Sequence, residues 1–152
     1  MGGFTPRTLT LNGRVVSPAP VDEVFPLFSP EGERLWVPGW DPELLYPPGV
    51  EWAQGQIFRT HEAHGEAVWV VTRLDRAGHR AGYHRIEPGR YVAHVEVESC
   101  AAPDGGTETE VSYTYVGLSA DGNREIAAMK QDDYEAKLAH WATWIRAHLG
   151  AA

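Results

Sequence analysis

The chain has little of what a disulfide-stapled or membrane-embedded protein needs. Its 152 residues include a single cysteine, Cys100, so no internal disulfide can form, and we interpret this residue as structural. No apolar run approaches the ~18 residues of a membrane span. The first residues, MGGFTPRTLTLNGRVV, lack the continuous apolar stretch of a secretory signal. We therefore expect a soluble, cytoplasmic protein without a membrane span.

Positive charge is also scarce. The sequence has 13 Lys and Arg residues against 21 Asp and Glu residues, a formal net charge of -8, and no local run of basic residues offsets it. Such a surface would repel a phosphate backbone. Nucleic acid is therefore not an expected partner.

The motifs of common enzymes are missing as well. The sequence contains no Ser-His-Asp order, no Cys-His pairing, no glycine-rich phosphate loop and no dinucleotide-binding fingerprint. We therefore expect no cofactor, and whether the protein is an enzyme stays uncertain at this stage.

What the chain does have is the length of one domain, expected over residues 1–152 with residues 1–6 disordered. The alternation of apolar and polar residues in RTLTLNGRVV predicts a first strand. Helical spacing in VDEVFPLFS then predicts a short helix interrupted by Pro26. Ser29 followed by Pro30 predicts the start of a second short helix, because serine caps helices and proline suits their first position.

Residues 51–118 consist almost wholly of short β-branched and apolar runs, which predict five strands. The joints AHG, RAGH, EPGR and APDGG are short and rich in Gly, Pro or Asp, as in β-hairpins. Parallel crossovers would need longer connections, so we expect an antiparallel meander. In RYVAHVEVES the alternation predicts one buried set and one solvent-facing set: Tyr91, Ala93, Val95 and Val97, against His94, Glu96 and Glu98.

The last segment, NREIAAMKQDDYEAKLAHWATWIRAHL, predicts one long amphipathic helix. Its apolar stripe recurs at helical spacing and consists of Tyr134, Leu138, Trp141, Ile145 and Leu149.

This order of elements indicates the α+β fold class: a curved antiparallel sheet of six to seven strands wrapped around a long C-terminal helix, with two short helices after strand one. A sheet that curls around one helix leaves a gap between the two, and small ligands bind in such gaps. We therefore expect a cavity between the sheet and the C-terminal helix.

Several stretches resemble a known superfamily. VSPAPVDEVFPLFSPEGERLWVPGWDPELLYP is similar to the passage in which SRPBCC or START-like proteins leave strand one and enter their helix pair. GQIFRT, VWVVTRLD, YTYVGLS and YEAKLAHWATWI resemble later landmarks of the bacterial members of this superfamily. The resemblance spans nearly the whole chain and implies the helix-grip (Bet v 1-like, START-like) fold of birch-pollen-allergen-like proteins, lipid-transfer START domains and polyketide cyclases. It does not fix the activity, because this superfamily keeps its shape while its chemistry changes.

Aromatic side chains are the candidates for the cavity wall. GERLWVPGWDPELLYP carries two tryptophans and a tyrosine in a proline-stiffened segment, which we expect either to line the cavity or to pack in the core. A strand tyrosine offers apolar area and one hydroxyl that orients a ligand, although a satisfied core tyrosine is about as common. A histidine titrates near neutral pH and suits an acid or base inside the cavity. The predicted ligand-binding residues are Trp36, Trp40, Trp69, Tyr83, His84, Tyr91, Tyr113, Tyr115 and Trp141.

The HEAHGE stretch, residues 61–66, is the densest group of potential metal ligands. A zinc-protease motif needs histidines four apart on a helix, but the position four after His61 is Gly65 and the setting is a hairpin. We therefore predict no metal site, while convergence of His61, His64 and Glu66 on one ion is left open.

Three functions are consistent with these observations. The favoured one is binding of a small hydrophobic or aromatic molecule in the cavity by a monomer or homodimer. The second is a polyketide cyclase- or dehydratase-like enzyme, in which a Tyr, a His or Arg73 assists proton transfer. The third is an interaction protein resembling the activator of a chaperone ATPase, which would use its outer surface and have a nearly filled cavity.

Overall fold

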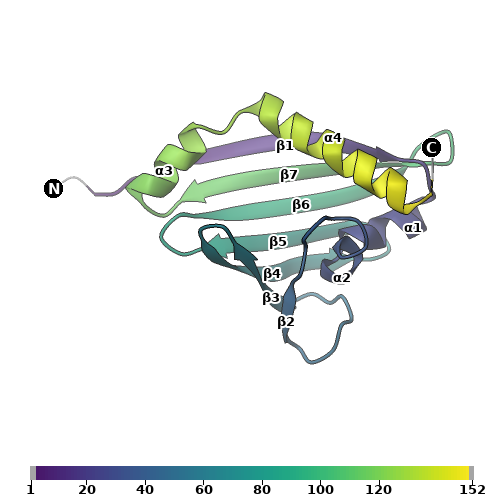
Figure 1. Ribbon diagram of the computed structural model, residues 1–152, viewed down its shortest axis with the longest axis horizontal. Helices are drawn as coiled ribbons and strands as arrows, with labels where there is room; N and C mark the ends of the chain where they lie inside the picture. Colours follow the sequence, from purple (N-terminus) through teal and green to yellow (C-terminus); the bar gives the residue numbers. More distant parts are fainter. Residues whose placement is uncertain (1–2, 151–152) are drawn as a thin grey trace.

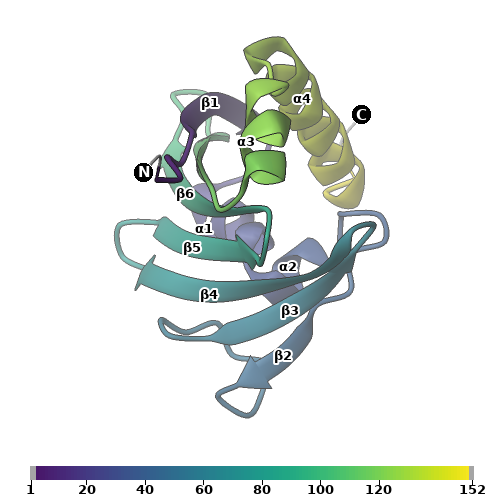
Figure 2. The same ribbon diagram turned by 90° about the vertical axis from the view of Figure 1, so that its left-hand side faces the viewer.

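The computed structural model describes residues 3–150, which form a seven-stranded antiparallel sheet with helices on its concave side (Figures 1 and 2). The sheet order is β1-β7-β6-β5-β4-β3-β2. The strands are β1 (Thr8–Ser17), β2 (Glu43–Tyr46), β3 (Ile57–Glu62), β4 (Gly65–Asp75), β5 (Arg80–Glu87), β6 (Tyr91–Ala101) and β7 (Thr107–Gly117). The helices are α1 (Val21–Val24), the 3-10 helix η1 (Phe25–Phe28), α2 (Pro30–Glu33), α3 (Ala120–Ala127) and α4 (Gln131–His148).

Strands β3 to β7 follow one another as antiparallel neighbours, which confirms the predicted meander of five strands. Strand β1 lies at one edge of the sheet and pairs with β7, where Leu11 lies opposite Tyr113. Burial along β6 alternates as the sequence predicted, with the odd-numbered residues from Tyr91 to Val97 buried. These odd positions on β6 and β7 therefore form the inner face of the sheet. Cys100 falls on the other face of the sheet and is exposed.

The short helices after β1 begin where the sequence predicted. The Ser29 hydroxyl accepts a hydrogen bond from the Gly32 N–H at 2.9 Å and donates one to the Pro26 carbonyl at 2.7 Å. Pro30 occupies the first turn of α2. Pro26 lies within η1, where the α-helical turn tightens into 3-10 geometry. This cap fixes the turn that joins η1 to α2.

Strand β2 was not predicted, since its four residues stand in the stretch interpreted as irregular. It pairs with β3 at the edge of the sheet, where Glu43 lies opposite Arg59 and the two side chains form an ion pair at 2.8 Å. An edge strand tolerates flanking prolines such as Pro42 and Pro47, because one side of it needs no ladder hydrogen bonds. The prolines that argued against a strand are therefore compatible with this one.

The long C-terminal helix is present as α4. The sequence predicted one continuous helix over residues 123–149, and in this respect the prediction was wrong, because the first part of that segment belongs to a separate helix, α3. Ser119 caps α3 by accepting a hydrogen bond from the Gly122 N–H at 3.0 Å. Lys130 has an extended backbone and starts α4, which places Asp132 and Asp133 in its first turn. The helix dipole favours acidic residues there and would not favour them in a helix interior.

Helix α4 spans 18 residues, about 27 Å, and packs on β1. The predicted stripe faces the sheet, with Tyr134, Leu138 and Ile145 buried. Gly13 permits this close approach, because a Cβ at that position would overlap the Leu138 side chain. Figure 2 shows α4 on the same side of the sheet as α2, and the cavity described below lies between them.

Two further expectations concern the start of the chain and membrane spans. The expected disorder of residues 1–6 falls partly outside the described residues, while Thr5 accepts a hydrogen bond from the Asn123 side chain at 3.0 Å. No helix within residues 3–150 is long and apolar enough to cross a membrane.

Candidate functional site

A cavity of about 440 Å³ lies between the inner face of the sheet, α2 with the segment that follows it, and α4. This is within the usual size of small-molecule sites, roughly 300–1,000 Å³. Its wall combines aromatic and aliphatic side chains with a few charged ones. The residues that the following argument uses are Glu33, Trp40, Phe58, Glu62, Trp69, Tyr83, Arg85, Tyr113, Lys137 and Trp141.

Aromatic rings from the sheet and from the segment after α2 meet at one side of the cavity. Phe58 on β3 stacks on Trp69 on β4, with ring centroids 5.5 Å apart and planes 11° from parallel. Trp40 meets Trp69 edge to face at 5.7 Å. The Trp69 indole N–H donates to the Thr60 hydroxyl at 3.0 Å, and Thr60 donates to Glu62 at 2.8 Å. These contacts fix the orientation of the apolar wall.

The two tryptophans after α2 have their polar atoms satisfied by the short helices. The Trp36 N–H donates to the Leu27 carbonyl at 2.7 Å, and the Trp40 N–H donates to the Pro30 carbonyl at 2.9 Å. Arg34 holds the same segment through Glu31 at 2.8 Å and through Asp41, and it also donates to the Pro42 carbonyl. The segment is therefore irregular in backbone but fixed in position.

Three polar side chains face the cavity and make no hydrogen bond or ion pair with any of residues 3–150. Glu33 comes from the end of α2, Tyr113 from β7 and Lys137 from α4. Within residues 3–150, neither Glu33 nor Lys137 has an oppositely charged atom within 4.0 Å. Charged groups enclosed by protein are costly unless paired, so these groups are suited to contacts with a bound molecule.

Burial shifts the proton affinity of all three groups. Desolvation raises the pKa of Glu33 from 4.5 to about 8, against the opposing charge of Lys137. Desolvation, together with the positive charge of Arg85, lowers the pKa of Lys137 from 10.5 to about 8. Burial also raises the pKa of the Tyr113 hydroxyl well above 10.0, so this group keeps its proton. The cavity thus holds an acid and a base that exchange protons near neutral pH.

Arg85 adds a positive charge at the sheet side of the cavity. Its guanidinium lies over the Trp69 ring at 5.5 Å and is 3.3 Å from Glu62 and 3.2 Å from Glu87. Its Nε is buried and has no hydrogen-bond partner. The charge of Arg85 is thus partly neutralised by Glu62 and Glu87, and its side chain lines the sheet side of the cavity.

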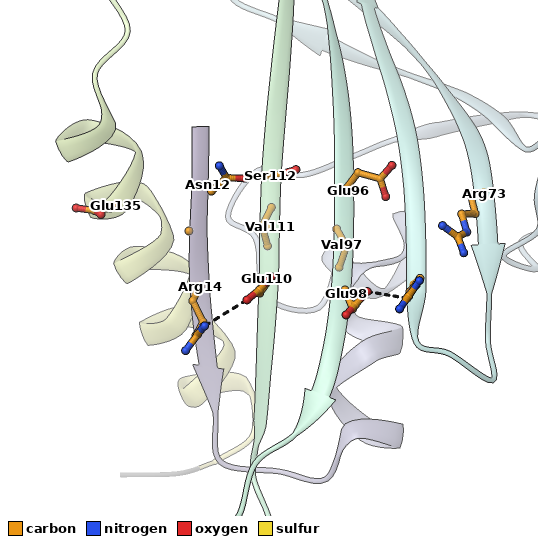
Figure 3. A pocket seen from close by; sticks show the side chains of 12 residues that line it. Asn12, Arg14, Arg73, Glu96, Val97, Glu98, Glu110, Val111, Ser112 and Glu135 are labelled. Atoms are coloured by element: carbon orange, nitrogen blue, oxygen red, sulfur yellow. Dashed lines mark hydrogen bonds and ion pairs between the residues drawn. The ribbon is translucent and has the colours of Figure 1, made fainter. Parts of the chain in front are cut away.

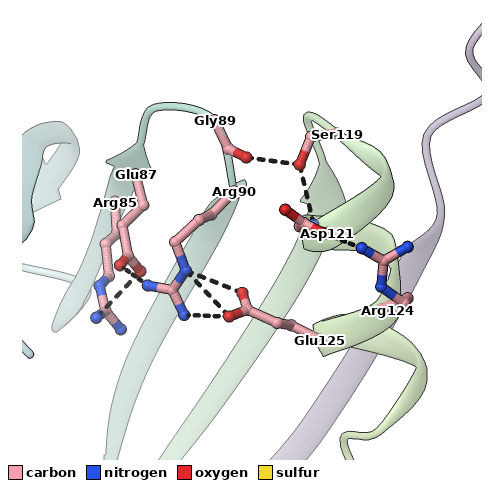
Figure 4. A network of polar contacts seen from close by, with 9 residues as sticks. Arg85, Glu87, Gly89, Arg90, Ser119, Asp121, Arg124 and Glu125 are labelled. Carbon is pink, nitrogen blue, oxygen red and sulfur yellow. Dashed lines mark hydrogen bonds and ion pairs between the residues drawn. The ribbon is translucent and has the colours of Figure 1, made fainter. Parts of the chain in front are cut away.

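A network of ion pairs ties one end of the sheet to α3 (Figure 4). Arg90 bonds the buried Glu87 and makes a bidentate pair with Glu125 on α3 at 2.9 Å. The Ser119 hydroxyl donates to the Gly89 carbonyl at 2.5 Å. The turn between β5 and β6 is therefore fixed against α3.

Five of the predicted residues line this cavity and four do not. Those at the cavity are Trp40, Trp69, Tyr83, Tyr113 and Trp141. Trp36 is buried behind the wall, against Phe28 at 5.8 Å and Trp141 at 5.7 Å. Tyr91 and Tyr115 pack edge to face at 5.2 Å, and Tyr115 borders a shallower hollow beside α3 and α4.

The placement of His84 in the cavity was wrong. Strand residues alternate between faces, and its neighbour Tyr83 points inward, where its hydroxyl donates to the Phe28 carbonyl at 2.7 Å. His84 accordingly lies on the outer face beside His94, with ring centroids 4.9 Å apart.

The outer face of the sheet carries a wider hollow of about 660 Å³ lined mainly by charged side chains (Figure 3). Many of these pair with one another, as Arg14 does with Glu110 at 3.2 Å and Arg80 with Glu98 at 2.6 Å. Arg73 belongs to this hollow, so its predicted role in proton transfer inside the cavity does not hold. Most charges of this surface are therefore neutralised by a neighbour, although Arg73 has no ion-pair partner among residues 3–150.

The HEAHGE stretch forms the end of β3, a turn and the start of β4. Glu66 is 3.4 Å from Arg59, and His61 borders the cavity. Among residues 3–150, no three His, Cys, Asp or Glu side chains come together in a group that could hold a metal ion.

Five of the site residues named above were not predicted: Glu33, Phe58, Glu62, Arg85 and Lys137. The signals for Arg85, Lys137 and Glu33 differ. Arg85 shares the inward face with Tyr83 by the same alternation that excludes His84. Lys137 lies three residues after Tyr134 and four before Trp141, on the edge of the apolar stripe of α4. Both signals were present in the sequence. Glu33 had no such signal, because its side chain reaches the cavity only through the turn made by the Ser29 cap.

Comparisons with known proteins bear on the fold. No protein-family model matches the sequence, and no curated protein matches it. Norcoclaurine synthase from Thalictrum flavum, in complex with dopamine and hydroxybenzaldehyde, matches with a TM-score of 0.69 at 14% identity, over 98% of this chain and 94% of that one. Major latex-like protein 151 from Panax ginseng matches with a TM-score of 0.68 at 14% identity, over 93% and 97%. Ara h 8.0201 matches with a TM-score of 0.63 at 17% identity, over 93% and 99%.

These matches define the class of the fold. The chain has the Bet v 1-like helix-grip fold, a curved antiparallel sheet that holds a C-terminal helix. The resemblance to the SRPBCC or START-like superfamily is confirmed at the level of the fold. Since this fold hosts different activities, the function has to be argued from the cavity itself.

Proposed function

We propose that the protein binds a small hydrophobic or aromatic molecule in the cavity between the sheet and α4. The observation that carries this proposal is a cavity of about 440 Å³ whose aromatic wall surrounds two charged groups, Glu33 and Lys137, that have no ion-pair partner among residues 3–150. Apolar walls with a small number of oriented polar groups are typical of ligand sites. A chain that only needed a filled core would not place Glu33 and Lys137 against an empty volume.

The arrangement also indicates the shape of the ligand. Phe58, Trp69 and Trp40 provide faces and edges for a planar ring. Glu33 and Lys137, from α2 and α4, provide a hydrogen-bond acceptor and donor at the helical side. We expect a ligand with one aromatic or unsaturated part and one polar end. The norcoclaurine synthase structure of the same fold contains two small aromatic molecules, which supports this class of ligand.

Native mass spectrometry of the purified protein for a co-purifying molecule, followed by thermal unfolding with a panel of small aromatic compounds, tests the proposal. A compound at a hundredfold excess over its Kd stabilises the folded state by about 2.7 kcal/mol. Trp69→Leu should abolish the shift in Tm for every hit. His84→Ala, on the outer face of the neighbouring strand, should leave it unchanged.

The unliganded Tm of each variant shows whether it is folded. Equal shifts in the Trp69→Leu and His84→Ala variants would place binding outside the cavity. The proposal would be contradicted if no compound of the panel shifts the Tm and no molecule co-purifies with the protein.

A second function, acid–base catalysis of the cyclase or dehydratase type, is favoured by one observation. Glu33 and Lys137 both titrate near pH 8 in the same cavity, beside the protonated Tyr113 hydroxyl. Turnover of a cavity ligand, lost in Glu33→Gln, would favour it over simple binding. The third function, an interaction protein with a filled cavity, is disfavoured by the cavity volume.

A further inference from the structure

The chain contains only two lysines, Lys130 and Lys137, against eleven arginines. Lys130 is exposed at the start of α4. Lys137 lies two turns further along the same helix, and its side chain lines the cavity. Arginine keeps its charge under all ordinary conditions, whereas lysine loses its proton readily when buried and then becomes a nucleophile. Lys137 therefore differs from the eleven arginines in its chemistry and from Lys130 in its surroundings.

The surroundings of the Lys137 amine are aromatic. Its Nζ lies 4.4 Å from the centroid of Tyr113, 5.2 Å from Trp141 and 5.7 Å from Tyr134. No carboxylate of residues 3–150 approaches within ion-pair distance. The amine is thus held on one side by rings and is open to the cavity on the other.

The charged and titratable groups around this amine come from four other elements and from its own helix. Glu33 of α2 and Glu62 of β3 favour the ammonium form, and Arg85 of β5 disfavours it. Tyr113 of β7 and Tyr134 of α4 keep their protons, because burial raises the pKa of both hydroxyls. Desolvation is the largest effect and lowers the pKa of Lys137 to about 8.

The consequence for reactivity is large. At about pH 7.5, a pKa of about 8 leaves roughly a quarter of the amine neutral, against about one part in a thousand for the ordinary value of 10.5. The neutral fraction, which is the reactive one, is therefore about two-hundredfold larger than for an ordinary lysine.

We propose that Lys137 forms a covalent imine with an aromatic or unsaturated aldehyde or ketone bound in the cavity. This proposal rests on the proposed binding function and adds the chemical class of the ligand. The Nζ lone pair attacks the carbonyl carbon, and the carbonyl oxygen takes up a proton to give a carbinolamine. Loss of that hydroxyl with one amine proton, as water, leaves the C=N bond. Oxidant and reductant are not required.

Glu33 and Tyr113 are the groups in the cavity that move or hold protons in this sequence. Glu33 carries a proton at neutral pH because its pKa is raised to about 8, so it is able to protonate the departing hydroxyl and then to take a proton back. The Tyr113 hydroxyl is an uncharged donor for the carbonyl oxygen. The aromatic wall holds the ring of the ligand beside the amine and limits return of water.

Reductive trapping tests the proposal with benzaldehyde as the probe. The full chain is incubated with benzaldehyde and sodium cyanoborohydride at a series of pH values, and labelled sites are located by peptide mass spectrometry. We expect Lys137 to be converted to its benzyl amine about a hundredfold faster than Lys130 at about pH 7.5, with a rate that levels off above about pH 8. Lys130, exposed at the start of α4, gives an internal standard for an amine outside the cavity.

Competition and variants separate a cavity reaction from a merely reactive amine. Benzyl alcohol, which has the ring without the carbonyl, should suppress labelling of Lys137 and leave labelling of Lys130 unaffected. Lys137→Arg keeps the charge and should lose the adduct, and its unliganded Tm shows whether it is folded. Lys130→Arg should change nothing at Lys137.

The outcomes distinguish the two proposals. A thermal shift with benzyl alcohol but no preferential labelling of Lys137 would overturn the imine and leave binding intact. Labelling of Lys137 that benzyl alcohol does not suppress would contradict binding in the cavity. Stabilisation by benzoate without any benzaldehyde adduct would identify Lys137 as an anion-binding ammonium and would also overturn the imine.

Discussion

The indole of Trp40 meets the indole of Trp69 edge to face, with centroids 5.7 Å apart and planes 86° from each other. One ring belongs to the irregular segment after α2 and the other to β4, in the middle of the meander. The contact therefore joins a proline-rich loop to the sheet, and the joined rings form one wall of the cavity. The aromatic density of this segment serves both core packing and the cavity wall.

Trp40→Ala should lower the free energy of unfolding by roughly 2 kcal/mol, less than for a fully buried tryptophan because Trp40 is half-buried. The substitution removes the contacts with Trp69 and Phe58 and the hydrogen bond to the Pro30 carbonyl. Urea unfolding followed by circular dichroism measures the change. Leu35→Ala, at an exposed position of the same stretch, is the control and should cost less than about 0.5 kcal/mol. Equal losses would mean that the segment does not depend on this ring contact.

The free energy of unfolding of Glu33→Gln should increasingly exceed that of the wild type as the pH rises from 4.5 to 8. In this window the folded protein keeps a proton on Glu33 that the unfolded chain has released, so the stability of the wild type falls with increasing pH. Glutamine cannot ionise and removes this loss. The difference should reach about 2 kcal/mol at pH 8, below what the full shift would give because water in the cavity screens the charge.

Urea midpoints of Glu33→Gln and wild type at several pH values measure this difference. Glu31→Gln, on the exposed side of the same turn, is the matched control, and its effect should not grow across the window. A Glu33→Gln difference that is constant from pH 4.5 to 8 would mean that the carboxyl of Glu33 is well solvated.

Tyr113→Phe should weaken binding of a phenol from the compound panel about five- to tenfold, since one hydrogen bond contributes about 1 kcal/mol. The ring and its stacking on Tyr115 at 5.8 Å are kept, so the fold is preserved. Isothermal titration calorimetry measures the affinity. Tyr91→Phe removes a hydroxyl outside the cavity and should leave the affinity unchanged, whereas a loss in both variants would point to a general effect on the sheet.

Gly122→Ala should destabilise the protein by roughly 3 kcal/mol. A Cβ at this position would overlap the carbonyl oxygen of Arg90, which is backbone and has no freedom to turn away. The docking of α3 on the β5–β6 turn would therefore open. Thermal unfolding measures the loss, and Asp121→Ala, at the exposed neighbouring position, should have little effect. A small change in Tm for Gly122→Ala would show that the docking of α3 contributes little to stability.

Period-two patterns and helix caps were sufficient to predict most of the fold. Each depends on residues close in sequence, such as Ser29 with Pro30, or the alternation around Val95. The break between α3 and α4 could not be predicted in the same way, because no proline or glycine lies at Ala128–Lys130. It depends on how each helix meets the sheet.

The apolar part of the site was easier to predict than its polar part. Tryptophans and tyrosines are buried more often than charged residues, so Trp69 and Tyr113 were natural candidates. The same rule assigns Glu33 and Lys137 to solvent. Glu33, at the end of α2, and Lys137, within α4, are distant in sequence, and the fold brings them to one cavity. His84 was assigned to the cavity by its chemistry, although its adjacency to Tyr83 already excluded the same face.

The order of Glu33, Arg85, Tyr113 and Lys137 along the chain has a consequence for biosynthesis. Because α4 supplies the last of these groups, the sheet and the short helices leave the ribosome before the cavity has its amine and its final wall. A nascent chain that has formed the whole meander therefore still lacks the complete site. Under the proposed binding function, the nascent chain would hold its ligand only after α4 has folded onto the sheet.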